Sequence, residues 1–202
     1  MGYSWTNIAA APVADANGFK TSVDMKVGAY ILDATAPTFG ARHVTCTRTR
    51  DGAGGTEDTP GTLILVGKDL AGSTITETLV PGAHTVVVTG TKFFASLTSA
   101  TGAGWVVDAG AGKDTLEIGW DAVCAVATGN GTLHGIVINT TAAGIITIAD
   151  AQGSIAVIPV SVAVGTFYEY DVAFSGYLRV EPAAASNITV LHTGSQPSTY
   201  SK

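Results

Sequence analysis

The sequence predicts an all-β fold, built as two β-sandwich or jelly-roll-like modules with an extended N-terminal arm. Short apolar runs separated by Gly, Pro, Asn and Asp recur at intervals of about 8 to 14 residues, which is typical of sandwiches and barrels. No segment shows the periodicity of an amphipathic helix. The composition agrees, because 25 glycines and a 46% hydrophobic, 13% charged chain indicate small side chains on sheets joined by tight turns.

The expected strands follow one another along the whole chain after the arm. In chain order they cover residues 22–34, 42–50, 61–68, 73–81, 83–90, 93–101, 105–109, 115–127, 133–140, 144–149, 155–164, 167–173, 177–182 and 187–191.

Alternation of apolar and polar residues is clearest in the segment "TLILVGKDLAGSTITETL". It predicts that Leu63, Leu65 and Gly67 share one face of a strand. After the turn, Ile75 and Leu79 are expected to face the core, with the threonines between them facing solvent. The runs "GIITIAD" and "IAVIPVSVAV" are more continuously apolar, which predicts strands covered on both faces by a second sheet or by another subunit.

Turn residues and composition divide the chain. The stretch "ATGNGTLHG" is a turn signal, and the part after it is nearly uncharged. We therefore expect an arm at residues 1–20, a first β-sandwich domain at 21–128, a second small one at 129–194, and a tail at 195–202. The arm is polar and alanine-rich, and is expected to become ordered only against a partner.

Charge and hydrophobicity exclude two classes of partner. The net charge is −6 and the densest basic cluster is "RTR" at residues 48–50, whereas nucleic-acid binding needs a concentrated basic face. The apolar run at residues 155–164 is far shorter than the roughly 20 residues that cross a bilayer. The low charged fraction instead favours a surface that neighbouring subunits cover, in an oligomer or assembly.

The glycine-rich stretch "DAGAGKDTLEIG" is the one segment that suggests phosphate binding. A phosphate loop needs a first glycine five residues before its Gly-Lys pair and a hydroxyl after it. Here those positions hold Val107 and Asp114, and the segment runs into a strand pattern rather than a helix. It is interpreted as a hairpin turn.

The other chemically active residues form no catalytic or metal-binding pattern. His43, His84, His134 and His192 are scattered, the carboxylates are dispersed, and no nucleophile motif occurs. The loop with Asp51, Glu57 and Asp58 could hold calcium or simply be solvated, and it lacks the order of a calcium-binding loop. We expect no enzyme activity, no metal and no cofactor.

For two sets of residues, the cysteines and a group of tyrosines, the sequence allows more than one structural interpretation. Cys46 and Cys124 lie in strand-like runs, and are either free buried thiols or a disulfide between neighbouring strands. In "FYEYDVAFSGYL", the side chains of Tyr168 and Tyr170 face oppositely to Phe167. With Tyr177, these tyrosines form a core stripe, a subunit interface or a glycan-binding platform.

The segment "TLILVGKDLAGSTITETLVPGAHTVVVTGTKFFASLTSATG" resembles virion structural proteins of tailed bacteriophages. Those proteins carry a strand like "ARHVTCT" at residues 41–47, a hairpin like residues 64–77 and a strand like residues 85–93. The stretches "LHGIVINT", "DVAFSGYLRV" and "NITVLH" resemble the small β-sandwich module of similar phage proteins. The resemblance covers most of the chain and includes no catalytic motif.

The resemblance implies a capsid decoration, or cement, protein on the surface of the virion, made in the host cytoplasm. Its partner would be the major capsid protein, and such proteins form homo-oligomers, with a trimer favoured. The expected contact residues are Tyr3, Trp5 and Ile8 in the arm, because aromatic anchors dominate interface energy. The alternatives are a tail fibre, spike or baseplate adhesin that binds a host-surface glycan, and a head–tail connector or tail component.

Overall fold

Every element of the computed structural model is a β-strand, and the described residues include no helix. The structure describes residues 3–25, 27–50, 58–106, 114–184 and 186–194. The chain forms two compact units. The central unit comprises Ala14–Asp69 and Ser73–Ala122, and the terminal unit, which holds both chain ends, comprises Met1–Val13, Leu70–Gly72 and Val123–Lys202. The predicted all-β fold is confirmed.

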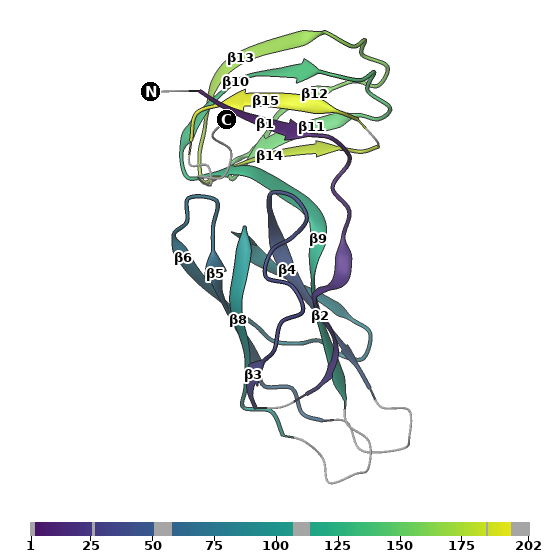
Figure 1. Ribbon diagram of the computed structural model, residues 1–202, viewed down its shortest axis with the longest axis vertical. Coiled ribbons are helices and arrows are strands. Elements are labelled where there is room, and N and C mark those ends of the chain that lie inside the picture. Colours follow the sequence, from purple (N-terminus) through teal and green to yellow (C-terminus); the bar gives the residue numbers. More distant parts are fainter. Residues whose placement is uncertain (1–2, 26, 51–57, 107–113, 185, 195–202) are drawn as a thin grey trace. The chain divides into compact units, whose positions relative to one another are not determined.

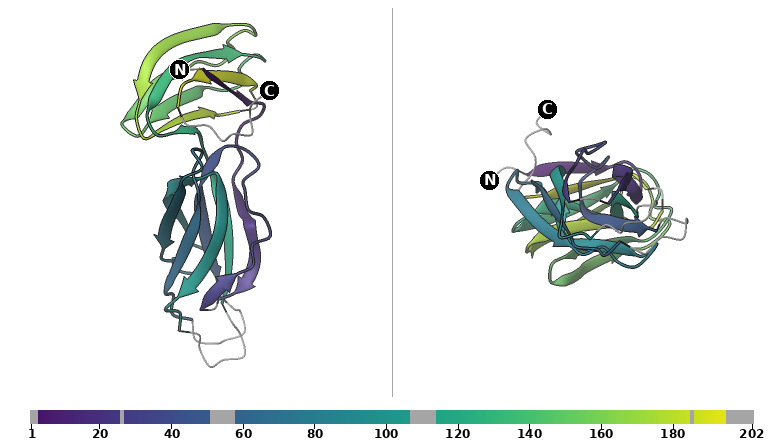
Figure 2. Two further views of the ribbon diagram at one scale, coloured as in Figure 1. Left: turned by 60° about the vertical axis from the view of Figure 1, so that its left-hand side comes forward. Right: turned by 90° about the horizontal axis from the view of Figure 1, so that it is seen from below.

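The strands of the central unit belong to a seven-stranded sheet and to a separate four-stranded sheet (Figures 1 and 2). Of the seven-stranded sheet, the central unit contains the part with the order β2-β9-β4-β7, with β2 (Asp15–Asp24), β9 (Thr115–Thr128), β4 (Ala41–Thr49) and β7 (Val87–Phe94). The four-stranded sheet has the order β3-β8-β5-β6, with β3 (Gly28–Tyr30), β8 (Ser96–Ala103), β5 (Thr62–Lys68) and β6 (Thr74–Leu79).

The core of the central unit is filled by alternate residues of these strands. Leu63, Leu65 and Gly67 are buried on one face of β5, as the sequence predicted. On β6, Leu79 is buried and Ile75 is half-buried, while the threonines between them are exposed. The edge of the Phe19 ring packs on Trp120 at a centroid distance of 4.9 Å, an arrangement that aromatic pairs prefer.

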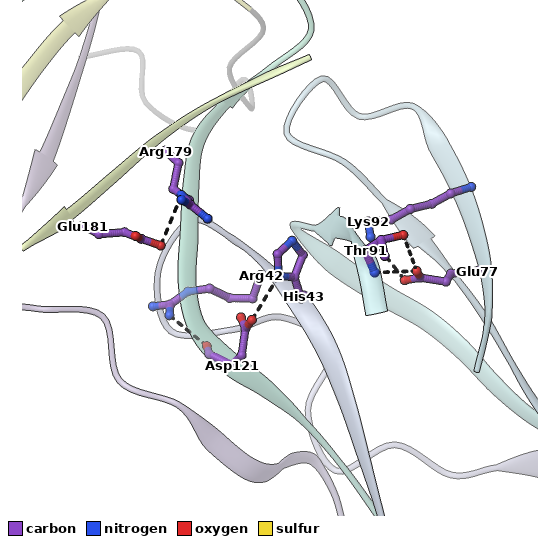
Figure 3. A network of polar contacts seen from close by, with 8 residues as sticks. All are labelled: Arg42, His43, Glu77, Thr91, Lys92, Asp121, Arg179 and Glu181. Atoms are coloured by element: carbon purple, nitrogen blue, oxygen red, sulfur yellow. Dashed lines mark hydrogen bonds and ion pairs between the residues drawn. The ribbon is translucent and has the colours of Figure 1, made fainter. Parts of the chain in front are cut away.

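At one edge of the central unit, the side chain of Glu77 on β6 hydrogen-bonds to the backbone of β7, where no further described strand pairs with it. The Glu77 carboxylate on β6 accepts hydrogen bonds from the backbone N–H of Thr91 at 2.6 Å and of Lys92 at 3.4 Å on β7. Lys92 Nζ donates in return to the carbonyl of Thr76 at 2.7 Å. Figure 3 shows Glu77 pointing toward Thr91 and Lys92. These bonds cover backbone groups of an edge strand that would otherwise be open to pairing.

The terminal unit also contains two four-stranded antiparallel layers. One sheet has the order β1-β15-β10-β13, with β1 (Ser4–Ile8), β15 (Ile188–His192), β10 (Gly131–Ile138) and β13 (Phe167–Phe174). The other has the order β12-β11-β14-β9, with β12 (Gly153–Ile158), β11 (Ile146–Asp150), β14 (Tyr177–Pro182) and the last residues of β9.

Branched aliphatic side chains fill the terminal unit. The fully buried ones include Ile8, Leu133, Ile136, Ile138, Ile146, Ile148, Ile158, Leu178, Val180, Ile188 and Val190. They come from strands of both layers, and one of them, Ile8, comes from the N-terminal end of the chain. Figure 1 shows β1, in purple, alongside β15, in yellow, although these strands lie at opposite ends of the chain.

The N-terminal residues differ from the expected arm. Ser4–Ile8 form β1 against β15, and Asp15–Asp24 form β2, paired with β9. The physical reason is that Thr6 and Ile8 alternate with exposed residues and fill the terminal unit's core. The division between the units falls between Ala122 and Val123, inside β9, rather than at the turn after it. The expected tail lies outside the described residues.

Candidate functional site

An exposed aromatic surface lies on the outer side of the sheet β1-β15-β10-β13. We call it the aromatic face and define it by four residues: Tyr3, Trp5, His134 and Phe167. Tyr3 is 55%, Trp5 60% and Phe167 46% exposed. The alternation along β1 places Trp5 outward, because its neighbours Ser4 and Thr6 pair with the inward residues His192 and Val190 of β15.

The strand register determines which residues of neighbouring strands lie opposite one another on this face. Trp5 lies opposite Leu191 on β15, and Leu191 in turn lies opposite Gly135 on β10. Gly135 leaves room for an aromatic ring, because a Cβ there would lie 2.4 Å from Cε2 of Phe167. The Phe167 ring can therefore lie close against the backbone of β10.

His134 reaches the aromatic face through an irregularity in both of its strand pairings. Leu133 and Gly135 pair with adjacent residues of β15, so His134 is an extra residue in that ladder. On the other side the pairing with β13 also shifts between Leu133 and Gly135. Such bulges redirect a side chain and are frequent beside functional sites.

Asp171 on β13 holds the imidazole of His134. The two side chains are hydrogen-bonded through His134 Nδ1 and Asp171 Oδ1. Asp171 has a φ of 47°, a left-handed conformation that Asp tolerates better than most residues. The ring centroid of Tyr3 lies 4.8 Å from that of His134, and the ring centroid of Phe167 lies 6.3 Å from it. An oriented carboxylate thus stands beside exposed rings.

A group of carboxamides adjoins the rings on the same sheet. The Asn7 amide donates to Asn187 Oδ1 at 2.9 Å and to Thr189 Oγ1 at 3.3 Å. The Asn139 amide donates to the same two acceptors, at 2.9 and 2.8 Å. This network ties β1 to β15 and to the residue that follows β10.

His192 lies beneath the aromatic face, on the inner side of β15. It is fully buried, and its Nε2 lies 3.2 Å from the Thr6 hydroxyl, while Nδ1 lies 3.4 Å from the Thr193 carbonyl. Both contacts fit a neutral ring that is protonated on Nδ1 and accepts from Thr6. Burial lowers the pKa of His192, and the hydrogen bond to Thr193 opposes part of this effect.

The structure brings together some of the predicted contact residues and separates others. Tyr3 and Trp5 are exposed on the aromatic face, whereas Ile8 is fully buried in the core and presents no surface to a partner. Tyr168 and Tyr170 stack at 6.4 Å and are half-buried. Tyr177 lies on β14, in the other sheet of the unit, and so does not extend that pair.

Sequence reasoning did not select Phe167 or His134 as residues of the candidate site. It had noted that Phe167 and Tyr168 face opposite ways, and the core-facing partner of Tyr168, Ile136, shows which way is outward. Deciding which face of that strand carries the core would therefore have selected Phe167. No local signal identifies His134, because its neighbour Tyr3 lies at the far end of the sequence.

The acidic loop proposed as a calcium alternative is only partly described. Asp51 and Glu57 lie outside the described residues, as does Lys113 of the glycine-rich stretch. Asp58 is buried, and its carboxylate accepts from the Asp114 N–H at 3.2 Å. Arg48 donates to the Asp58 carbonyl at 2.8 Å and pairs with the Asp114 carboxylate at 3.4 Å. In the described part of the chain, no group of three or more His, Cys, Asp or Glu side chains is arranged to hold a metal ion.

A second histidine–aspartate pair occurs in the central unit. His43 Nδ1 lies 2.9 Å from Asp121 Oδ2, and Arg42 donates to the Asp121 carbonyl at 3.2 Å (Figure 3). A general base needs its nucleophile or substrate within hydrogen-bond reach. The ring that the structure places against His43 belongs to Phe93, at a centroid distance of 4.1 Å. The pair therefore ties β4 to β9 and packs on β7.

Neither Cys46 nor Cys124 forms a disulfide and both are fully buried, which resolves the open question of a disulfide. Burial raises the pKa of Cys46 to about 12, so its thiol carries almost no reactive thiolate near neutral pH.

Comparisons with known proteins identify no relative. No protein-family model, curated protein or solved structure matches the chain. No helix in the described residues could span a membrane.

Proposed function

We propose that the chain is a non-enzymatic structural component of a phage virion that decorates the capsid and stabilises it by bridging capsomers. The observation that carries the proposal is the aromatic face. Tyr3, Trp5 and Phe167 expose large rings on one side of one sheet, in a chain with only 13% charged residues. Monomeric proteins rarely expose contiguous apolar surface of this kind unless it binds something.

The major capsid protein is the proposed partner, and homo-oligomers, with a trimer favoured, are the proposed form on the capsid surface. Tyr3 and Trp5 act as contact residues in this proposal, joined by Phe167. Ile8 supports them from below, because its burial fixes the strand that carries them. Shell stabilisation would then come from interface area that only the assembled particle contains.

The test locates the chain in purified particles by cryo-electron microscopy. The expected result is many copies at capsomer junctions, with Trp5 buried against the shell. A few copies at the tail tip or in the neck would contradict the proposal and favour an adhesin or a connector. A particle-binding assay adds matched variants. Trp5→Ala is expected to weaken binding, and Ile31→Ala, which removes an 81% exposed side chain elsewhere, is not.

Glycan binding is the second candidate, favoured by one specific arrangement. An exposed carboxylate, Asp171, is oriented by His134 beside the rings of Tyr3 and Phe167. Aromatic rings pack against the apolar faces of sugars, and a fixed carboxylate accepts hydrogen bonds from hydroxyl groups. An array of neutral glycans is the test. Binding that Phe167→Ala and Asp171→Asn both abolish would support an adhesin, and no binding to any glycan would exclude this role.

A further inference from the structure

We propose that β1 is exchanged between copies of this chain, so that Tyr3 and Trp5 of one copy complete the aromatic face of another. The inference goes beyond the proposed function, because it holds whatever the aromatic face binds. The occupant of the groove beside β15 would be the same segment, Ser4–Ile8, supplied by a second copy.

The position of β1 makes it separable. It is the outermost strand of its sheet and pairs with β15 over five residues, from Ser4↔His192 to Ile8↔Ile188. Its departure would break no ladder between other strands. Only two of its side chains, Thr6 and Ile8, are buried.

The contacts of β1 are ones that a second copy could make equally well. Its side chains reach His134 through Tyr3, His192 through Thr6, and Asn187 and Thr189 through Asn7. All of these partners lie between residues 134 and 192. None of the contacts depends on the covalent connection between β1 and the rest of its own chain.

The connection after β1 favours an extended path. Residues 9–14 form no strand, and the boundary between the two units falls between Val13 and Ala14. Val13 is 73% exposed. Pro12 fixes its own φ and restricts the preceding Ala11 to extended conformations. Six such residues span up to about 20 Å, so the hinge can carry β1 away from its own unit without refolding.

An empty acceptor edge would be costly, which favours exchange over simple release. Without β1, the backbone of β15 would be an unpaired edge. The space filled by the buried side chain of Ile8 would be empty, and the buried His192 would lose its contact with Thr6. Strand exchange keeps every one of these contacts and is therefore a low-cost route to a closed oligomer. Crowding of copies on an assembly surface would raise their effective concentration further.

Cysteine cross-linking between chains tests the exchange directly. Asn7 and Thr189 are opposite one another in the β1–β15 ladder. Asn7→Cys in one tagged chain and Thr189→Cys in a second, differently tagged chain would be co-expressed and mildly oxidised. The native cysteines are buried and do not compete. We expect a disulfide-linked pair carrying both tags, and N7C/T189C in a single chain is expected to form linked multimers whose size gives the copy number.

Cross-linking confined to single chains would overturn the proposal, as would absence of the two-tag product when the single-chain double variant does oxidise. Because Asn7→Cys removes a side-chain network, the pair Trp5→Cys and Leu191→Cys, also opposite in the ladder, repeats the test without touching it. Asn7→Cys with Val157→Cys is the control for random collision, because Val157 is exposed on β12 in the other sheet. A two-tag product of equal yield from that control would also count against exchange.

Discussion

Gly135 has the strictest local requirement on the aromatic face. A Cβ at this position would lie 2.4 Å from the Phe167 ring and 2.6 Å from the carbonyl oxygen of Tyr168. We expect Gly135→Ala to displace the ring and to lower the free energy of unfolding by about 1–3 kcal/mol, the usual cost of overpacking. Urea denaturation measures it. Adding Phe167→Ala should recover only part of the loss, because the backbone contact remains, and full recovery would contradict this explanation.

Glu77 makes a second prediction at the scale of one residue. Its carboxylate accepts from two backbone N–H groups and from the Thr91 hydroxyl, the last at 3.0 Å. Hydrogen bonds to a charged acceptor are stronger than neutral ones. We expect Glu77→Ala to cost about 1–2 kcal/mol in unfolding free energy and Glu77→Gln less. Glu169→Gln, at an exposed position on β13, is the control. Equal losses from all three variants would show that the seam between β6 and β7 contributes nothing specific.

At the scale of elements, β1 carries one residue that stabilises the fold, Ile8, and another that is proposed to bind a partner, Trp5. Ile8 is fully buried, so Ile8→Ala should cost about 2–5 kcal/mol in unfolding free energy. Trp5 is 60% exposed, so Trp5→Ala should change stability by less than about 1 kcal/mol while weakening partner binding. Thermal unfolding and particle binding, measured on both variants, check the contrast. A large stability loss from Trp5→Ala would mean that its ring packs as core.

The strands that the sequence predicted best are those whose signals are local. Alternation along β5 and β6 follows directly from side-chain geometry, and the turn between them is marked by its own residues. In contrast, β1 was missed because its apolar content is small and its partner strand lies at the opposite end of the chain. Such a pairing is set by tertiary packing, through Ile8, and leaves no periodic signal in five residues.

The candidate site was predictable only in pieces for the same reason. Tyr3 and Trp5 were selected as aromatic contact residues of an expected arm, and the tyrosine stripe directed attention to β13, but nothing in the sequence joins the two segments. The contact between Tyr3 and His134 depends on the β1–β15–β10 register and on a bulge at His134. Bulges add one residue to one strand, and no sequence pattern here marks where that happens.

At the scale of the whole molecule, the pH dependence of stability follows from which groups are shifted. Burial keeps the pKa of His192 below its ordinary value of about 6.5 in the folded state. As pH falls below that value, the unfolded chain binds a proton that the folded chain does not, so the free energy of unfolding decreases. The pKa values of the Asp33 and Asp150 carboxyls are lowered by hydrogen bonds. Their stabilisation is present above the ordinary carboxyl range and is lost only at lower pH.

The pH range in which His192 affects stability lies above the range in which the two carboxyls do. The contribution of His192 to the free energy of unfolding can therefore be measured separately. Between pH 7.5 and pH 5.5 we expect the free energy of unfolding to fall with a slope that approaches about 1.4 kcal/mol per pH unit, the value for one proton. His192→Gln should flatten this slope whatever its effect on stability at neutral pH. Since Thr6 of β1 contacts His192 at 3.2 Å, acid should loosen β1 first. Hydrogen exchange at β1 and β15 that stays constant across this pH range would contradict that link.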